Sequence, residues 1–174
     1  MVIDRTNDLV GRGLAWLSIA MVSVQFIVVI MRYVFGVSWL MMQESIIYMH
    51  GILFMIAAGY TLLHDGHVRV DIFYRDASER TKALVDMLGS ALLLLPVVGV
   101  IFIGALPYVR QSWSSLEGSV ETSGIPAVYL LKSVILVFCV LIGMQGVSMF
   151  IRSLITVMGG PATVKHDDGS VPHG

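Results

Sequence analysis

The sequence has few charged residues and a single cysteine. Acidic and basic side chains make up 13% of its 174 residues, about half of the roughly 25% that is usual in soluble domains. A soluble chain of this length has too little interior for a composition that is 56% hydrophobic. Disordered chains are poor in apolar residues, so disorder is excluded as well. The composition therefore predicts an integral membrane protein.

Neither positive nor negative charge is in large excess, since 11 basic and 12 acidic residues leave a net charge of −1. Nucleic-acid-binding proteins present a basic surface, so we expect no nucleic-acid partner. The single cysteine, Cys139, cannot form an internal disulfide or a Cys-x-x-Cys redox pair. It lies in an apolar run, and we interpret it as a small buried hydrophobic residue.

Long apolar runs are what the chain has in abundance. A membrane-spanning helix needs about 20 apolar residues, and four segments reach or approach that length. They cover residues 14–31, 45–63, 83–109 and 127–151. No small-residue cleavage site follows the first run, which favours a retained span over a signal peptide. The predicted fold is all-α, with one four-span membrane domain over 1–155 and a polar, mobile tail over 156–174.

The connection between the second and third spans is amphipathic. Within residues 64–80, apolar and charged side chains alternate from Val68 to Phe73. An unpaired strand at a membrane surface would leave its backbone groups open. We therefore expect a helix or extended segment lying on the cytoplasmic face of the bilayer. Asp76, three residues before Glu79, resembles a capping box and predicts that the third helix starts there.

Ionisable residues at membrane depth are the usual functional candidates in membrane proteins, and this sequence has very few. His50 lies near one end of the second span, and a haem role would need a second histidine at matching depth. We interpret it as a histidine that bonds between helices. His64 and His67 flank Asp65 and Gly66, with a spacing that favours a turn over a metal site. We predict no metal, no cofactor and no enzyme activity.

Two other residues bear on helix packing. Glu44 opens the second span, and we expect it to pair with Arg32 or Lys132. Pro96 lies in the middle of the third span, where it removes a backbone hydrogen bond and predicts a kink. With no catalytic group and no charged path across the membrane, the sequence indicates a protein that assists another polypeptide.

Several motifs recur in one known family. RYVFG stands at residues 32–36 and GYTL at 59–62, and HDGHVRVD follows at 64–71. KALVDMLG stands at 82–89 and GIPA at 124–127. Over about residues 10–155 the chain resembles the small membrane subunit, DctQ type, of tripartite ATP-independent periplasmic (TRAP) transporters. Many members carry paired acids after the tryptophan, whereas this chain has only Glu44. The chain is most similar to the branch labelled for 2-oxo acids and for mannitol or chloroaromatic compounds.

The resemblance implies a fold, a function and partners. The small subunit of this family has four spans and lies in the bacterial inner membrane with both termini in the cytoplasm. Its partners are a large multi-span permease subunit (DctM type), a periplasmic substrate-binding protein (DctP type) and membrane lipids. The resemblance thus implies a scaffold subunit for sodium-coupled uptake of organic acid anions. The alternative is a self-assembling small channel or exporter, in which His50 or Gln145 would line the pore.

We expect two contact surfaces for these partners. The extracytoplasmic surface, which would dock the binding protein, comprises Trp39, Glu44, Trp113, Glu117 and Glu121. The surface against the large subunit comprises His50, Gly51, Ala58, Gly143 and Gly146. Small residues enter the second set because they let helices approach closely in lipid.

The distribution of basic residues predicts the orientation of the chain. Eight Lys and Arg residues flank one side of the four spans and three flank the other, and the richer side is cytoplasmic. A topology map with reporter fusions checks this. A phosphatase fused after the C-terminal Gly174 is expected to be inactive, and one inserted after Gly118 to be active. An active C-terminal phosphatase would contradict the predicted orientation.

Overall fold

The structure is a computed structural model that describes residues 2–64, 66–67 and 77–159. These residues form helices and connections, and none of them is in a strand. In chain order the elements are α1 (Val2–Tyr33), α2 (Leu40–Leu63), α3 (Glu79–Gly89), the π-helical turn η1 (Ser90–Leu94), α4 (Leu95–Ser114) and α5 (Val128–Val157). Four helices, counting α3, η1 and α4 as one, are long and apolar enough to cross a membrane. The predicted all-α fold with four spans is confirmed.

Two sequence predictions fall mainly outside the described residues. Of the amphipathic segment predicted over 64–80, residues 65 and 68–76 lie outside the described part of the chain. Residues 160–174, which are most of the predicted polar tail, lie outside it too, so both stay predictions. Asp76, the expected start of the third helix, is also outside. The residue that caps this helix is Ser78, whose Oγ accepts a hydrogen bond from the Thr81 amide at 3.2 Å. A serine at this position satisfies one of the free amides of the first turn.

The helices are longer than the apolar runs that predicted them. α1 has 32 residues and includes the polar segment before residue 14. α2 has 24 residues and begins at Leu40, so it is about 36 Å long at a rise of about 1.5 Å per residue. His50 consequently lies near the middle of its helix, about 15 Å from Leu40, and the prediction that it lies near one end is wrong.

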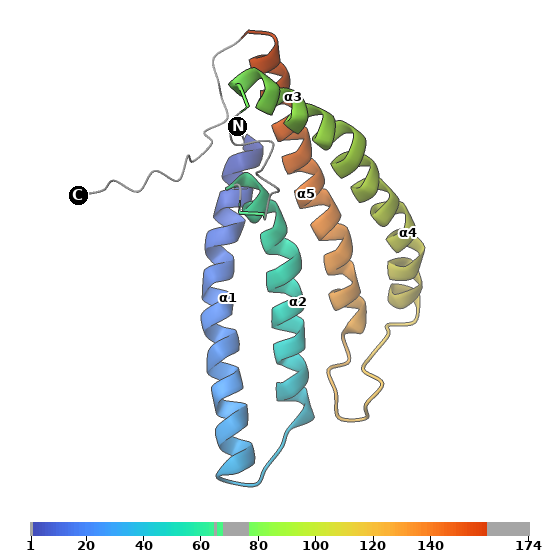
Figure 1. Ribbon diagram of the computed structural model, residues 1–174. Coiled ribbons are helices and arrows are strands. Elements are labelled where there is room, and N and C mark those ends of the chain that lie inside the picture. The colour runs from blue at the N-terminus through green and yellow to red at the C-terminus, as the bar shows by residue number, and fades with distance from the viewer. Residues whose placement is uncertain (1, 65, 68–76, 160–174) are drawn as a thin grey trace, which may run out of the picture.

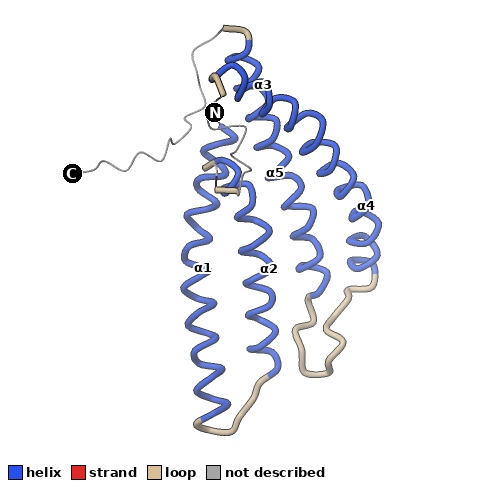
Figure 2. The backbone as a smooth tube through the Cα atoms, in the orientation of Figure 1, coloured by secondary structure: helices blue, strands red, loops and turns tan. Residues whose placement is uncertain are grey.

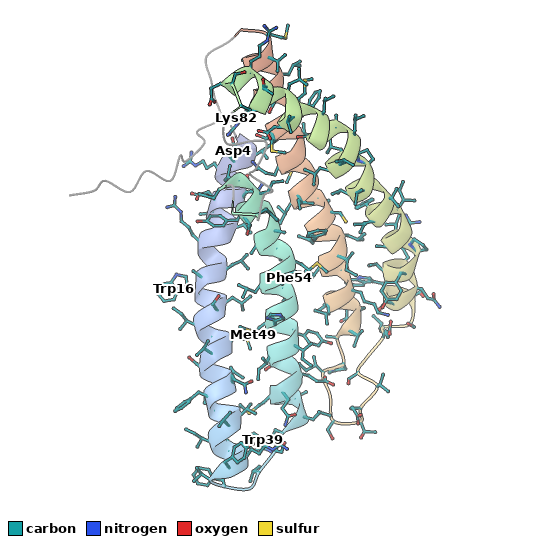
Figure 3. All side chains as sticks on the ribbon, viewed as in Figure 1. Asp4, Trp16, Trp39, Met49, Phe54 and Lys82 are labelled. Atoms are coloured by element: carbon teal, nitrogen blue, oxygen red, sulfur yellow. The ribbon has the colours of Figure 1, made fainter. Side chains whose placement is uncertain are left out.

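The spans stand side by side in the order α1, α2, α5 and α4, as Figure 1 shows. α5 contacts α2 on one side and the α3–η1–α4 helix on the other, and it is the most buried span. Over the described ranges, neither α1 nor α2 contacts α4. The spans therefore form an open layer and not a closed bundle. Figure 3 shows Trp16 on α1 pointing away from the other helices.

The two ends of the layer differ in what they carry. The start of α1, the end of α2, the start of α3 and the end of α5 lie at one end, here called the terminal end. The α1–α2 and α4–α5 connections lie at the opposite end, here called the loop end (Figure 2).

The third span, Glu79–Ser114, is one helix of 36 residues that curves around α5 (Figure 1). The π-helical turn Ser90–Leu94 lies in its middle, directly before Leu95 and Pro96. Proline has no amide hydrogen, and a π turn changes the bonding register locally so that the helix can continue. The bend expected at Pro96 is thus present as a π turn. Beneath it, Val98 packs with the buried Cys139 and Ile142, and the prediction for Cys139 is confirmed.

A buried polar cluster connects α1 to α5 near the terminal end. The side chain of Asn7 is 1% exposed, and its Nδ2 donates to Oε1 of Gln145 at 2.8 Å. Ser148 Oγ donates to Asp4 Oδ1 at 3.0 Å, and Arg152 forms an ion pair with the same carboxylate. Away from water such groups are costly unless they are bonded to one another. The cluster therefore holds α1 against α5 in one register.

Close contacts hold α1 against α2 as well. A Cβ on Gly11 would lie 2.1 Å from a ring carbon of Tyr60, and a Cβ on Gly59 would lie 3.0 Å from Oδ1 of Asn7. A larger residue at Gly11 would overlap the Tyr60 ring, and one at Gly59 would crowd the Asn7 amide. The Tyr60 ring in turn packs on His64, with ring centroids 4.2 Å apart. Small residues thus allow the approach that brings Asn7 within reach of α5.

Replacing Gln145 by Leu tests the polar cluster. The change leaves the Asn7 amide without its acceptor, and we expect the free energy of unfolding to fall by about 1–2 kcal/mol. The measurement is thermal unfolding of the purified protein in detergent. The double variant Asn7→Leu, Gln145→Leu should lose less than the sum of the single changes, because it leaves neither partner unpaired. Strict additivity, or an unchanged midpoint in Gln145→Leu, would contradict the assignment. Val147→Leu is the control on an exposed face of α5.

Candidate functional site

The α4–α5 connection is folded against the start of α2 by one carboxylate. Oε1 of Glu44 accepts a hydrogen bond from Ser119 Oγ at 2.5 Å, and Oε2 accepts one from the Ile125 amide at 2.6 Å. Both oxygens therefore face the loop. The prediction that Glu44 pairs with Arg32 or Lys132 is wrong, since the carboxylate bonds to a hydroxyl and a backbone amide.

Backbone hydrogen bonds close the same loop. The Ser119 amide donates to the carbonyl oxygen of Ile125 at 3.2 Å, and the Gly124 amide donates to that of Glu121 at 3.0 Å. A Cβ on Gly124 would lie 2.2 Å from Ser119 Oγ and 2.6 Å from Oε1 of Glu44. Only glycine fits there without displacing the carboxylate. The loop is thus held in one shape against the layer.

A second acid is paired at the base of the loop. Nζ of Lys132 donates to Glu117 Oε2 at 2.5 Å and lies 4.0 Å from the centroid of the Tyr108 ring. The hydrogen bond from Lys132 lowers the pKa of the Glu117 carboxyl below its ordinary value. Beside this pair, Nε1 of Trp113 donates to Ser133 Oγ at 2.7 Å, which leaves part of the indole ring exposed. These contacts connect the end of α4 to the start of α5.

The residues predicted to dock a periplasmic partner all lie at the loop end, but only some of them are free to contact a partner. Glu44 and Glu117 are bonded inside the protein and hold the loop in place. Trp39, in the α1–α2 connection, is exposed at the loop end (Figure 3), and Glu121 is exposed near the tip of the loop. Sequence reasoning missed Val120, which is fully exposed beside Glu121. Its position as an apolar residue between two polar ones, Ser119 and Glu121, could have indicated it from the sequence.

Four of the five residues predicted to pack against a large partner make contacts within this chain. Gly51 lies against α5, Gly143 lies against α4, and Gly146 lies against η1 and α4, where an added Cβ would be 2.8 Å from a leucine carbon. Ala58 packs on the core beneath the bend. Their small size serves this chain's own helix contacts, and their contact with a large subunit stays a prediction. His50 alone of the five is exposed.

The setting of His50 also differs from the expectation. Its ring lies 6.4 Å from that of Phe54, one helical turn along α2, at an interplanar angle of 20°. No residue in the described part of the chain forms the interhelical hydrogen bond that was predicted for it. Across the same residues, no group of three or more His, Cys, Asp or Glu side chains could hold a metal ion.

The fold and these contacts define an α-helical membrane protein whose polar groups connect helices and loops. A family model described as "Tripartite ATP-independent periplasmic transporters, DctQ component" matches residues 21–156. This match covers most of the chain, which therefore belongs to the DctQ family and is a small membrane subunit of a TRAP transporter. The family predicted from the motifs is confirmed, and it is a family of transporter components and not of enzymes. Comparisons with curated proteins and with solved structures gave no match.

Replacing Glu44 by Ala tests its role in shaping the loop. The change removes the acceptors of Ser119 Oγ and of the Ile125 amide, so we expect amide exchange at Ile125 to become severalfold faster. Hydrogen–deuterium exchange of the purified protein measures this. Glu121→Ala, which changes an acid in the same loop, should leave the Ile125 amide protected. Equal exchange in the Glu44 variant and the parent protein would refute the assignment.

Proposed function

We propose that this chain is the scaffold subunit of a sodium-coupled uptake system for organic acid anions. It lies in the bacterial inner membrane with both termini in the cytoplasm, beside a large permease subunit of the DctM type. A periplasmic binding protein of the DctP type delivers the substrate. The open layer of helices is the observation that carries the proposal. A single layer encloses no interior through which a solute could pass, whereas it has a wide face with which to cover a larger subunit.

The polar groups support a scaffold over a self-assembling channel. A conducting pore needs polar side chains along its length. Gln145, one of the two pore candidates, is 4% exposed and bonded to Asn7, so it is not available to a pore. His50 is a single polar residue at one depth. A pore lined by these residues would have no continuous polar path.

The loop end supports a docking role for the outer face. In the predicted orientation it faces the periplasm, and Trp39, Val120 and Glu121 extend from it. Glu44 and Glu117 hold the loop that carries two of these three residues. Because the loop is already ordered, a binding protein would dock without the entropic cost of folding it. We infer that the binding protein contacts Trp39 and the tip of the α4–α5 loop.

Affinity purification from native membranes tests the proposed function. A tagged chain is expected to bring down a multi-span protein and a secreted binding protein, both identified by mass spectrometry. Deleting the chain should abolish uptake of labelled organic acids, and uptake in the parent cells should depend on a sodium gradient. A chain that purifies only with copies of itself and conducts ions alone in liposomes would overturn the proposal and favour a channel.

The docking role of the loop tip predicts a kinetic effect. The double variant Val120→Asp, Glu121→Lys changes the exposed tip without touching the carboxylates that hold the loop. We expect the concentration of binding protein that gives half-maximal uptake to rise severalfold, because exposed charges at an interface act mainly on association. Uptake by proteoliposomes that contain the membrane complex measures it. Arg80→Glu, an exposed charge reversal at the terminal end, is the matched control. Identical curves for the loop variant and the parent would exclude docking at this tip.

A further inference from the structure

A trough lies on one face of the layer between α2, α4 and α5. Its larger part has a volume of about 400 Å³ and is lined by Ile47 and His50 of α2, Tyr108 of α4 and Lys132 of α5, among others. A second hollow of about 280 Å³ shares Ile47 and Val128 with the first and extends it toward the loop end. The trough exists because α2 and α4 do not touch, so that α5 forms its floor.

Two polar groups of the trough have no hydrogen-bond partner among the described residues: the Tyr48 hydroxyl, which is buried in the smaller hollow, and the exposed ring of His50 in the larger one. Lys132, the cation of the trough, already contacts Glu117 and Tyr108. The His50 ring lies near the middle of α2, where lipid tails offer no hydrogen-bonding group. A neutral imidazole has one donor and one acceptor nitrogen, and leaving both unpaired at this depth is costly. Polar residues within spans almost always face protein or a water-filled cavity.

We propose that a transmembrane helix of the large permease subunit packs over this trough and presents a hydroxyl or amide side chain to His50. This inference rests on the proposed function, because it assigns that subunit its place on the layer. Hydroxyl and amide groups both donate and accept, which matches the two nitrogens of a neutral imidazole, and they avoid the cost of a charge at this depth. The partner side chain is therefore Ser, Thr, Asn or Gln.

The shape of the trough fits the same occupant. Ile47, His50 and Phe54 lie three and four residues apart, so they form one exposed stripe along α2. A helix is about 10 Å across, too wide to enter a hollow of about 400 Å³. It would rest on the stripe and fill the hollow with its side chains. An acyl chain would also fill the hollow, but it would leave both nitrogens of His50 unpaired.

A pair of isoleucines provides the steric test. Ile47 is 62% exposed in the trough, and Ile19 is 57% exposed on α1. With both membrane subunits expressed and this chain tagged, Ile47→Trp is expected to lose most of the co-purifying large subunit, and Ile19→Trp to keep it. A parent chain that fails to bring down the large subunit overturns the proposed function. A parent chain that succeeds, with Ile47→Trp equally effective or Ile19→Trp equally defective, overturns the trough alone.

The chemistry of His50 is tested by a second set of variants. His50→Leu should lower the fraction of complex that survives size-exclusion chromatography in detergent severalfold, and His50→Gln should restore it. Gln25→Leu is the matched control, because Gln25 is another exposed polar residue and lies about 12 Å from the end of α1 at Tyr33. An intact complex in His50→Leu, or an equal loss in Gln25→Leu, overturns the assignment of His50.

Crosslinking distinguishes the possible occupants directly. A photoreactive amino acid at position 47 in the otherwise unchanged complex should form a product with the large subunit. A product with lipid, or with a second copy of this chain, would overturn the proposal even though the complex itself remains intact.

Discussion

The hydrogen-bonded contact between α1 and α5 decides how the layer is arranged. In lipid the apolar faces of helices gain little by leaving the hydrocarbon for one another, so polar bonds and close packing determine which helices associate. Asn7 and Gln145 are buried and bonded across 138 residues of sequence, and Asp4 adds contacts to Ser148 and Arg152. Without these bonds, α1 would be held by α2 alone. The cluster therefore fixes the position of the first span relative to the central one.

Polar side chains also bond neighbouring elements to one another at the loop end. There Glu44 connects α2 to the α4–α5 loop, and Lys132 connects α5 to Glu117. Small residues also hold the helices together, such as Gly146, which lets η1 and α4 approach α5. A layer bonded at both ends and closely packed between them resists shearing of one helix past another. That stiffness is the property a scaffold needs.

Sequence reasoning recovered the parts of the fold that depend on local properties. The lengths of the apolar runs gave four spans, and the missing amide of Pro96 predicted the bend. The partners of Glu44, the exposure of His50 and the order of the helices were not recoverable in this way. These features depend on the rotation of each helix about its axis, and a span that is apolar all round carries no periodic signal for that rotation. Asn7 was missed because the polar start of α1 was taken to lie before the helix, although its bonded partner lies in the last span.

The distribution of polar bonds also indicates which helices are fixed relative to one another and which surface is free to bind a neighbour. Sliding α1 past α5 would break the Asn7–Gln145 bond at a depth where no water replaces it, and sliding α4 would pull the loop from Glu44. The stripe that contains His50 has no such bonds to the rest of the chain as far as the structure describes it. A neighbouring subunit can therefore bind that stripe without disturbing the layer, and the layer can keep its shape while parts of the neighbour change theirs. A chain whose polar groups are bonded internally at both ends suits the stationary side of a transporter.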